Sequence, residues 1–278
     1  MRKIKIVADS SCDLCELKYT EFSVAPMKII TEEREFVDDS SLDVDAMVDY
    51  FYQYKGKSRS SCPNISDWLE AFGDADEIFC VTITSGLSGS YNSACAAKQI
   101  YEKENDGKRV FVCDTLSAGP EITLIIEKIE EYIGKGMTYE DICDNIKKYK
   151  EKTGLVFILK SLRNFANNGR VSPIMAKLIG ITGIRVVGRA SSKGTLEPKN
   201  KCRGDRRSLE ILIEELESEG FRSGKISIGH CQNESAAEQL KKMIMEKFMN
   251  IQVEIHKLKG LCSFYAEKGG VLVGFEKC

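Results

Sequence analysis

A loop rich in hydroxyl groups follows a short apolar segment in the first half of the chain. The apolar segment, EIFCVTI at 77–83, has the composition of a buried strand, and TSGLSGSYNSA at 84–94 follows it directly. This loop carries Gly86, Gly89 and five Ser or Thr hydroxyls, and a helix-like stretch begins near Ser90. A strand, a turn and a helix N-terminus form a familiar anion site, because unpaired backbone N–H groups converge there. We therefore expect this loop to bind an anion, whose identity the loop alone leaves open.

Three better-known site motifs fit this loop poorly. A P-loop needs a lysine after its second glycine, and no lysine follows GLSG at 86–89. The dinucleotide fingerprint is absent here, and ADSSCDL at 8–14 contains no glycine at all. The loop only approximates a nucleophile elbow, with Ser88 as the nucleophile and His230 or His256 as the base. A lipid-ester hydrolase using Ser88 stays open as an alternative, as does a plain role of these hydroxyls in helix capping and turns.

Length and charge limit the class of protein. The chain has 278 residues, which exceeds the usual size of one hydrophobic core, so two domains are expected. Its formal net charge of -2 gives no support for a nucleic-acid-binding or anionic-membrane-binding surface. We therefore expect no nucleic-acid partner.

The cysteines and the apolar segments predict a cytoplasmic protein without metal or cofactor. No apolar run approaches the length of a transmembrane helix, so we expect no stable membrane insertion. The eleven cysteines are odd in number and scattered, which favours reduced thiols. The one C-x-x-C, from Cys12 to Cys15, has no second pair, and two histidines leave few zinc ligand sets.

The elements that must position the loop alternate between strands and helices. Such alternation implies a parallel sheet with helices on its faces, and ligands of these sheets bind beyond the carboxyl ends of the strands. Asp9 and Asp114 end two of the strands, where they either orient the hydroxyls of the loop or shape turns. The expected strands are 3–10, 22–31, 77–83 and 108–115, and the expected helices are 42–54, 65–75, 90–103, 121–136 and 138–152, the last opened by Thr138.

After Gly154 the alternation ends. Two strands joined at Lys193-Gly194 form a hairpin, which does not belong to a parallel α/β unit. We predict a two-domain α/β protein, with residues 1–153 as a three-layer α/β domain with a mainly parallel sheet and residues 154–278 as an α+β domain with a mixed sheet. The prediction of the second domain rests on the following segments. The first are a strand at 154–160, short helices in 162–180 broken at Asn168-Gly169 and Ser172-Pro173, and the hairpin at 183–203. After them come a helix capped by Asp205, strands at 225–230 and 251–258 around a helix capped by Asn233, and a strand at 270–277.

Three further residues attract attention because of their type. Trp68, the only tryptophan, is expected in the core. His230 follows a strand, where it is expected to satisfy nearby backbone groups. Arg170 follows Gly169 at a helix stop, and it either binds carbonyl oxygens or belongs to a partner surface.

Six segments match, in order, motifs of one known family. ADSSCDL resembles its opening DS-[TS]-x-D-[LV], SSCPN at 60–64 its T-S-x-P-S, and TSGLSGSYNSA its S-S-x-L-S-G-T-Y-x-S-A. Three more family segments are similar to CDTLSAG at 113–119, LRNFANNGRVS at 162–172 and KCRGDRRSLE at 201–210. The chain thus resembles the DegV family of bacterial fatty-acid-binding proteins over nearly its whole length.

This resemblance implies that the anion is a carboxylate. Family members hold one long-chain fatty acid, with the tail buried between the domains and the carboxylate at loops of the N-terminal domain. They present it to a separate fatty acid kinase for phospholipid synthesis, so the protein is a carrier with no catalytic residues. Carried over by position, the carboxylate ligands are Ser60 and Ser88, and the supporting residues are Ser61, Ser85, Gly89 and Arg203, the last behind the head group.

The chain departs from the family pattern at a few positions. Ser60 replaces a threonine, Cys62 stands where glutamine is frequent, and Asn64 replaces a serine. Many relatives also carry a C-terminal His-x-G-x-G whose histidine helps to bind the head group, and CSFYAEKGGVLVGF at 262–275 has no histidine. Tyr265 or Lys268 could supply the missing donor; a different ligand or partner is the other interpretation.

Overall fold

The first sheet lies at the N-terminal end of the chain. The computed structural model describes residues 2–171 and 183–277. Four parallel strands form this sheet in the order β2-β1-β6-β7, as the strand and helix alternation predicts. Because all four strands are parallel, their carboxyl ends meet at one edge. The strands are β1 (Ile4–Asp9), β2 (Glu21–Ala25), β6 (Glu77–Thr82) and β7 (Arg109–Asp114).

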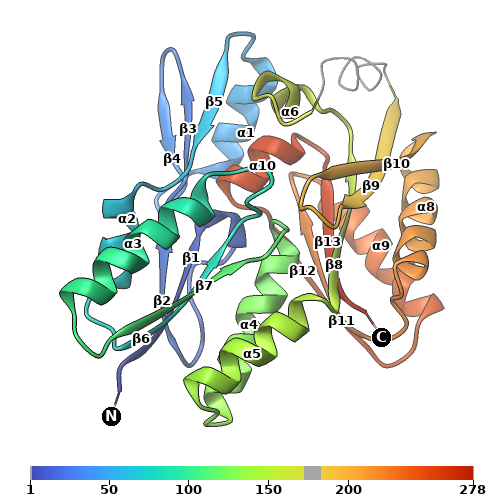
Figure 1. Cartoon of the computed structure of the whole chain (residues 1–278). Coiled ribbons are helices and arrows are strands. Elements are labelled where there is room, and N and C mark those ends of the chain that lie inside the picture. Colours follow the sequence, from blue (N-terminus) through green and yellow to red (C-terminus); the bar gives the residue numbers. More distant parts are fainter. Residues whose placement is uncertain (1, 172–182, 278) are drawn as a thin grey trace.

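Helices cover both faces of the first sheet (Figure 1). One face packs on α2 (Ile65–Phe72) and α3 (Ser90–Glu104), in a core that contains Trp68 with none of its surface exposed. The other face packs on α4 (Pro120–Gly134), beside which lies α5 (Tyr139–Lys150). The expected positions of Trp68 in the core and of Thr138 as the cap of α5 are confirmed.

A small antiparallel sheet interrupts the alternation. It consists of β3 (Lys28–Thr31), β4 (Glu35–Val37) and β5 (Ser58–Ser61), with α1 (Val44–Gln53) between the last two strands in sequence. The prediction of one strand over 22–31 is wrong, because β2 ends before Pro26 and β3 belongs to the small sheet. Proline has no N–H to give to a ladder, and the chain turns at this residue.

The second large sheet is mixed and has the order β10-β9-β8-β13-β11-β12. Its neighbours are antiparallel except β11 and β12, and β9 and β10 form the expected hairpin. The predicted fold class, a mainly parallel sheet followed by a mixed sheet, is confirmed. The strands are β8 (Thr153–Leu159), β9 (Ile184–Ala190), β10 (Leu196–Arg203), β11 (Gly224–His230), β12 (Ile251–Lys257) and β13 (Val271–Glu276).

Two long helices cover the outer face of the second sheet, as Figure 1 shows. They are α8 (Asp205–Ser218) and α9 (Glu234–Lys247), and they enclose a separate apolar core with that face. Asp205 does not cap α8 as expected: it is the first helical residue, after Gly204, and its carboxylate pairs with Arg185 at 2.8 Å. Asn233 precedes α9 without a capping side-chain bond, because its amide donates to the carbonyl of Gly269 instead.

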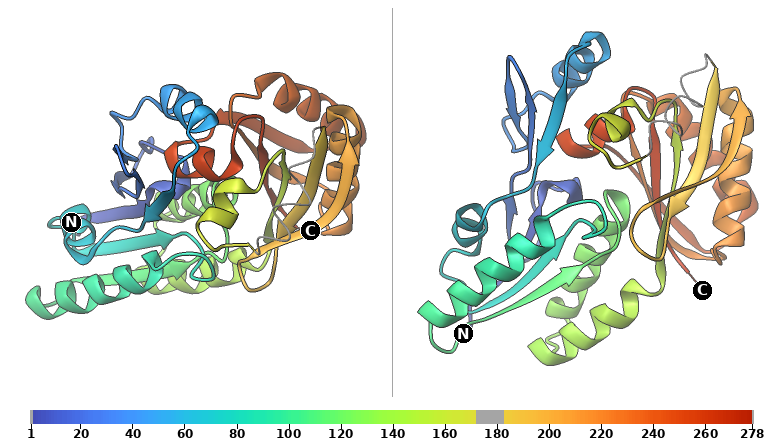
Figure 2. Two further views of the ribbon diagram at one scale, coloured as in Figure 1. Left: turned by 90° about the horizontal axis from the view of Figure 1, so that it is seen from above. Right: turned by 45° about the horizontal axis from the view of Figure 1, so that its top comes forward.

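Two short helices lie between the sheets. They are α6 (Arg163–Asn167) and α10 (Gly260–Ala266), and α10 contacts α1, α6 and β3. Both views of Figure 2 show α10 between the small sheet and the mixed sheet. One apolar core continues from the first sheet through this helix to the inner face of the second. The expected helix break at Ser172-Pro173 lies outside the described residues.

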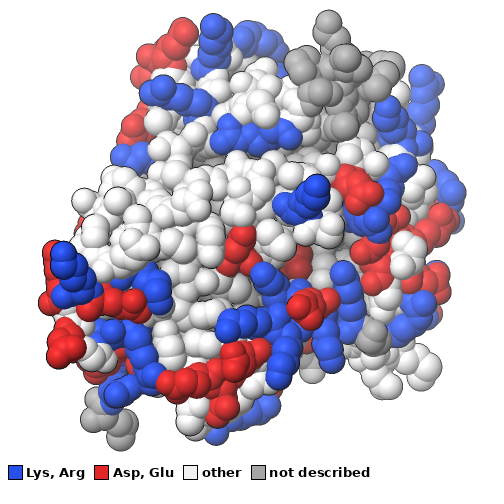
Figure 3. All heavy atoms as spheres, viewed as in Figure 1, with Lys and Arg blue, Asp and Glu red and all other residues white. Residues whose placement is uncertain are grey.

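Three further observations concern the surface charges, the helices and the cysteines. On the face shown in Figure 3, basic and acidic side chains are interspersed, so no broad stripe of one sign covers it. No helix in 2–171 or 183–277 combines the length and apolar character that crossing a bilayer requires. The cysteines of these same ranges are free thiols.

Candidate functional site

Two buried or partly buried aspartates fix the hydroxyl-rich loop at the carboxyl edge of the first sheet. The Asp9 carboxylate accepts from the backbone N–H of Ile83 at 2.9 Å and from the hydroxyl of Ser90 at 2.6 Å. The Asp114 carboxylate accepts from the backbone N–H of Ser85 at 3.0 Å and from its hydroxyl at 2.5 Å. Burial raises the pKa of Asp9, and the bonds from Ser11 and Ser90 oppose that rise. Both interpretations of these aspartates hold: each orients a hydroxyl of the loop, and each also accepts a turn bond from the backbone N–H two residues on, Ser11 or Leu116.

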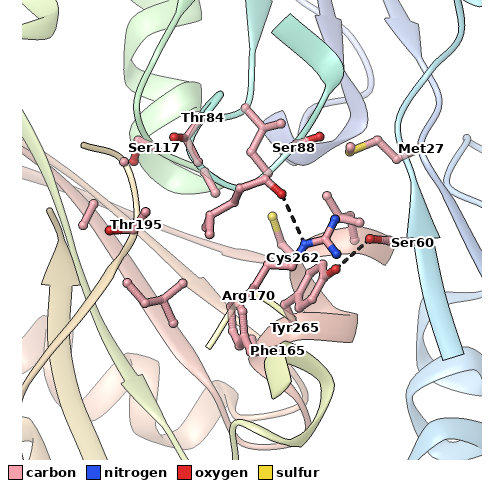
Figure 4. A pocket seen from close by; sticks show the side chains of 18 of the residues that line it. Met27, Ser60, Thr84, Ser88, Ser117, Phe165, Arg170, Thr195, Cys262 and Tyr265 are labelled. Atoms are coloured by element: carbon pink, nitrogen blue, oxygen red, sulfur yellow. Dashed lines mark hydrogen bonds between the residues drawn. The ribbon is translucent and has the colours of Figure 1, made fainter. Parts of the chain in front are cut away.

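A cavity of about 440 Å³ opens beside this loop, between the first sheet and the inner face of the second (Figure 4). Its volume falls in the range of roughly 300–1,000 Å³ that is usual for small-molecule sites. Most of the lining is apolar, and a few polar side chains interrupt it. The lining includes Met27, Ile30, Ile83, Leu87, Ala118, Leu155, Phe157, Leu159, Phe165, Ala190, Leu196, Leu261, Ala266 and Leu272, with Arg59, Ser60, Ser61, Cys62, Thr84, Ser88, Gly89, Ser117, Arg170, Gly194, Thr195, Cys262 and Tyr265.

Ser60 and Ser88, the expected carboxylate ligands, both line this cavity, although Ser60 lies on strand β5 and Ser88 in the loop before α3. Ser61 and Gly89 line it as well. Ser85 does not, because its hydroxyl is engaged by Asp114 on the far side of the loop. The structure therefore gathers four of the six expected site residues around one cavity.

Arg203 lies apart from this group. It ends β10 with an exposed side chain and is outside the cavity lining. Its expected place behind the head group is not seen in the described part of the chain, and two other arginines, Arg59 and Arg170, line the cavity. The role of Arg203 stays a prediction.

Ser60 forms a hydroxyl pair with Tyr265 of α10. Their oxygens are 2.6 Å apart, and the Tyr265 ring packs on Phe165 with a centroid distance of 4.7 Å. Burial raises the pKa of Tyr265, so its hydroxyl keeps its proton and can donate. Lys268, the other candidate for the missing histidine, points elsewhere and pairs with Asp49 at 3.1 Å. Of the two alternatives, only Tyr265 lies at the cavity.

Ser88 has two roles that are compatible. Its oxygen accepts from the backbone N–H of Ser90, two residues on, at 3.3 Å, as the turn interpretation expects; the N-cap residue of α3 is Gly89, so Ser88 does not cap this helix. A hydroxyl that accepts one bond still has its proton, which can be donated to a second partner. Because Ser88 also lines the cavity, that proton is available to a ligand.

Arg170 lines the cavity, a position that the sequence did not assign to it. Its guanidinium donates to the carbonyl oxygens of Leu87, at 3.2 Å, and of Asn168, which confirms the carbonyl-binding interpretation. Within residues 2–171 and 183–277, no carboxylate forms an ion pair with Arg170, and its two hydrogen-bond partners there are neutral. Figure 4 shows Arg170 between the Ser88 loop and the Ser60–Tyr265 pair, and its charge lowers the pKa of Tyr265 against the effect of burial. A cation here favours an anionic ligand group.

Both histidines lie away from the cavity. His230 accepts from the backbone N–H of Asn233 at 3.2 Å, which confirms its expected local role. His256 lies on β12, 3.4 Å from the Ser227 hydroxyl, and burial lowers its pKa to about 4. Ser88 therefore has no imidazole beside it, and the arrangement of a serine hydrolase is not present.

Comparison with known proteins agrees with the sequence motifs. The family model described as "Uncharacterised protein, DegV family COG1307" matches residues 3–277. A DegV domain-containing protein of Streptococcus pneumoniae is 42% identical over 276 residues, which are 98% of each chain.

Two solved structures are similar to this chain over almost its whole length. A DegV family protein of Eubacterium eligens, loaded with heptadecanoic acid, has 44% identity and a TM-score of 0.97, with 99% of this chain and 100% of that chain covered. The Streptococcus pneumoniae Fatty Acid Kinase (Fak) B3 protein, loaded with linoleic acid, has 41% identity and the same TM-score, with 99% of each chain covered.

Proposed function

The chain belongs to the DegV family, and from that premise we propose that it binds one long-chain fatty acid and presents it to a separate fatty acid kinase. The observation that carries the proposal is an apolar cavity in which Ser60, Ser88, Arg170 and Tyr265 lie around one region. An apolar tail and a single anionic group are what such a lining accommodates. The similar structures with heptadecanoic and linoleic acid support this ligand class.

The tail and the head group contribute differently to binding. Burying about 14 methylenes gains roughly 11 kcal/mol before the costs of association, at about 0.8 kcal/mol for each. Each hydrogen bond to a charged head group adds about 1.5–3 kcal/mol, and an unpaired buried carboxylate would cost more. The tail therefore supplies most of the affinity, and the polar residues set the orientation and the preference for an acid.

We assign the carboxylate to the hydroxyls of Ser60, Ser88 and Tyr265, with Arg170 as the nearby cation. Ser61, at the end of β5, and Gly89, before α3, line the cavity beside the two ligands, and the bond from the Ser85 hydroxyl to Asp114 helps to fix the loop at 84–94. In this assignment the head group lies where Ser60 and Ser88 of the 1–153 segment meet Arg170 and Tyr265 of the 154–278 segment. The tail runs against the inner face of the mixed sheet in that second segment, the predicted second domain. We also propose that the protein is cytoplasmic.

Removing either serine hydroxyl should weaken the preference for an acid. In Ser60→Ala and Ser88→Ala we expect a fatty acid to lose about 1–3 kcal/mol of binding, or about 5- to 150-fold in affinity, because one donor to the carboxylate is lost. The alcohol of the same chain length keeps the tail without the charge, so its affinity should change little. Titration calorimetry with heptadecanoic acid and heptadecanol measures both values.

The matched control is Ser61→Ala, because that serine lines the cavity beside Ser60 while its hydroxyl donates to the carbonyl of Cys62. It should keep the preference of the wild type. If Ser60→Ala and Ser88→Ala both keep the full preference for the acid, the assignment of these serines to the carboxylate is wrong.

A protein that only carries a fatty acid catalyses no reaction itself. We propose that the protein is not an enzyme, because Ser88 lacks a neighbouring base and the described residues contain no group of three or more His, Cys, Asp or Glu that could hold a metal. Ester hydrolysis by the purified protein that disappears in Ser88→Ala would support the lipid-ester hydrolase instead.

The kinase step gives a second prediction. The loaded protein should yield an acyl phosphate when it is mixed with the fatty acid kinase of the same cell and ATP, because the carboxylate is bound mainly by neutral hydroxyls that also suit a phosphoryl group. Hydroxamate trapping measures the product. If fatty acid binding is normal and no product forms, delivery to a kinase is excluded, and a storage role replaces it.

A further inference from the structure

Two buried carboxylates hold the beginning of α10. Asp38 accepts from the backbone N–H groups of Gly260 and Leu261, both at 2.8 Å, and Asp13 accepts from that of Lys259 at 2.7 Å. The aspartates are 3% and 6% exposed. Lys259, the residue before the helix, makes no side-chain capping bond of its own. The first N–H groups of α10 are therefore satisfied from two distant loops of the chain.

The close approach of Asp38 depends on a glycine. A Cβ on Gly260 would lie 2.5 Å from Oδ1 of Asp38 and 2.6 Å from the side chain of Leu42. Such distances are below van der Waals contact, so a larger residue at 260 would push the helix away from Asp38. The segment LKGL at 258–261 thus fits the carboxylate closely.

Asp13 is buried in a left-handed backbone conformation, with φ +59°. Aspartate is one of the few residue types other than glycine that adopt this region readily. Besides the N–H of Lys259, the thiol of Cys262 interacts with its carboxylate. Burial raises the pKa of Asp13 to about 8, although the bond from Lys259 opposes this. The buried carboxylate of Asp13 is therefore kept in place by donors from α10 and from the residue before it.

The helix that these carboxylates hold carries one wall of the cavity. Leu261, Cys262, Tyr265 and Ala266 of α10 all belong to the lining. Tyr265 lies about one turn beyond the residues that Asp38 binds, and its hydroxyl is 2.6 Å from Ser60. A shift of α10 would therefore move the Tyr265 hydroxyl relative to Ser60.

We propose that Asp38 and Asp13 are positioning residues for the head-group site, which act by fixing α10 so that Tyr265 donates to the same ligand group as Ser60. This inference rests on the proposed function. Neither aspartate lines the cavity, so both act through the helix and not on the ligand. The motif ADSSCDL has two acidic residues with different partners. Asp9 fixes the loop at 84–94, and Asp13 binds the residue before α10.

The test compares Asp38→Asn in two backgrounds. An amide at this place keeps one acceptor oxygen and turns an NH2 group toward the other backbone N–H, so α10 should shift. In the wild-type background we expect the preference for heptadecanoic acid over heptadecanol to fall about fivefold or more. In Tyr265→Phe, where the hydroxyl is already absent, Asp38→Asn should leave the preference unchanged.

A merely structural role of Asp38 would give a different result, namely equal losses for acid and alcohol in both backgrounds. Full preference for the acid in Asp38→Asn would also overturn the proposal. The matched control is Asp39→Asn, an exposed neighbour whose carboxylate accepts from Ser41 and does not reach α10.

Asp13 keeps the test decisive should Asp38→Asn fail to fold. Asp13→Ala removes the acceptor for Lys259 and should lower the preference for the acid, whereas Asp13→Asn keeps that acceptor and should restore it, since asparagine tolerates positive φ. Equal preference in both variants would contradict the proposal.

Failure of the positioning role and failure of the proposed function give different results. If the wild type prefers the acid and these variants do not alter that preference, only the positioning role is wrong. If the wild type binds neither ligand, the proposed function is wrong, and the positioning role is wrong with it.

Discussion

An Ala190→Trp variant should lose most of its ability to distinguish a long fatty acid from a shorter one. Ala190 lies at the end of β9 and lines the cavity with Leu155 and Phe157 of the neighbouring strand β8. An indole in place of a methyl group occupies space equivalent to about five methylenes of a bound tail. At about 0.8 kcal/mol for each methylene, heptadecanoic acid should lose about 4 kcal/mol, or roughly 1,000-fold in affinity.

Dodecanoic acid, which is five methylenes shorter, should lose little, so the two acids should bind the variant similarly. Fluorescence displacement with both acids measures this ratio. Lys201→Trp is the matched control, because it adds the same ring to an exposed position of the adjacent strand β10. If Ala190→Trp keeps the wild-type ratio, the tail does not run along the inner face of the mixed sheet.

The sequence predicted the central sheets well because their strands are buried. EIFCVTI at 77–83 reads as an uninterrupted apolar run, and β6 within it is fully buried. Runs of this kind belong to parallel strands covered on both faces, so periodicity and length identify them. By contrast, β4 and β5 are short and partly exposed, and their sequences, EFV and SRSS, carry no such signal. The small sheet therefore could not be predicted from periodicity.

Contacts between residues far apart in the sequence limited how much of the candidate site could be predicted. Ser60 and Ser88 could be predicted as cavity residues because each lies in a local motif. The pairing of Ser60 with Tyr265 joins residues 205 positions apart, and only the packing of α10 between the sheets brings them together. Arg170 had a usable local signal, a glycine that ends α6 in a positive φ, but that signal does not say which carbonyl oxygens the guanidinium meets.

Gly194→Ala should destabilise the protein by about 2–5 kcal/mol. Gly194 is in the turn of the β9–β10 hairpin, with φ +70°, and a Cβ there would overlap the Thr84 hydroxyl and lie 3.0 Å from Cα of Leu116. The expected loss combines about 1–2 kcal/mol for alanine in a left-handed conformation with about 1–3 kcal/mol for overpacking. Urea unfolding measures it.

Gly107→Ala separates the two contributions, because Gly107 has φ +77° and a Cβ there would meet nothing within 4 Å. It should cost only the conformational part.

Gly86→Ala tests the same contact from the other side, since its Cβ would overlap the carbonyl of Lys193 although Gly86 has no positive φ. Once Gly194→Ala has moved the hairpin away from the loop, adding Gly86→Ala should cost little more, so the two losses should not add. Because Thr84, Gly194 and Thr195 line the cavity, a displaced hairpin should also release bound heptadecanoic acid faster. Fully additive losses with an unchanged release rate would mean that this contact does not close the cavity.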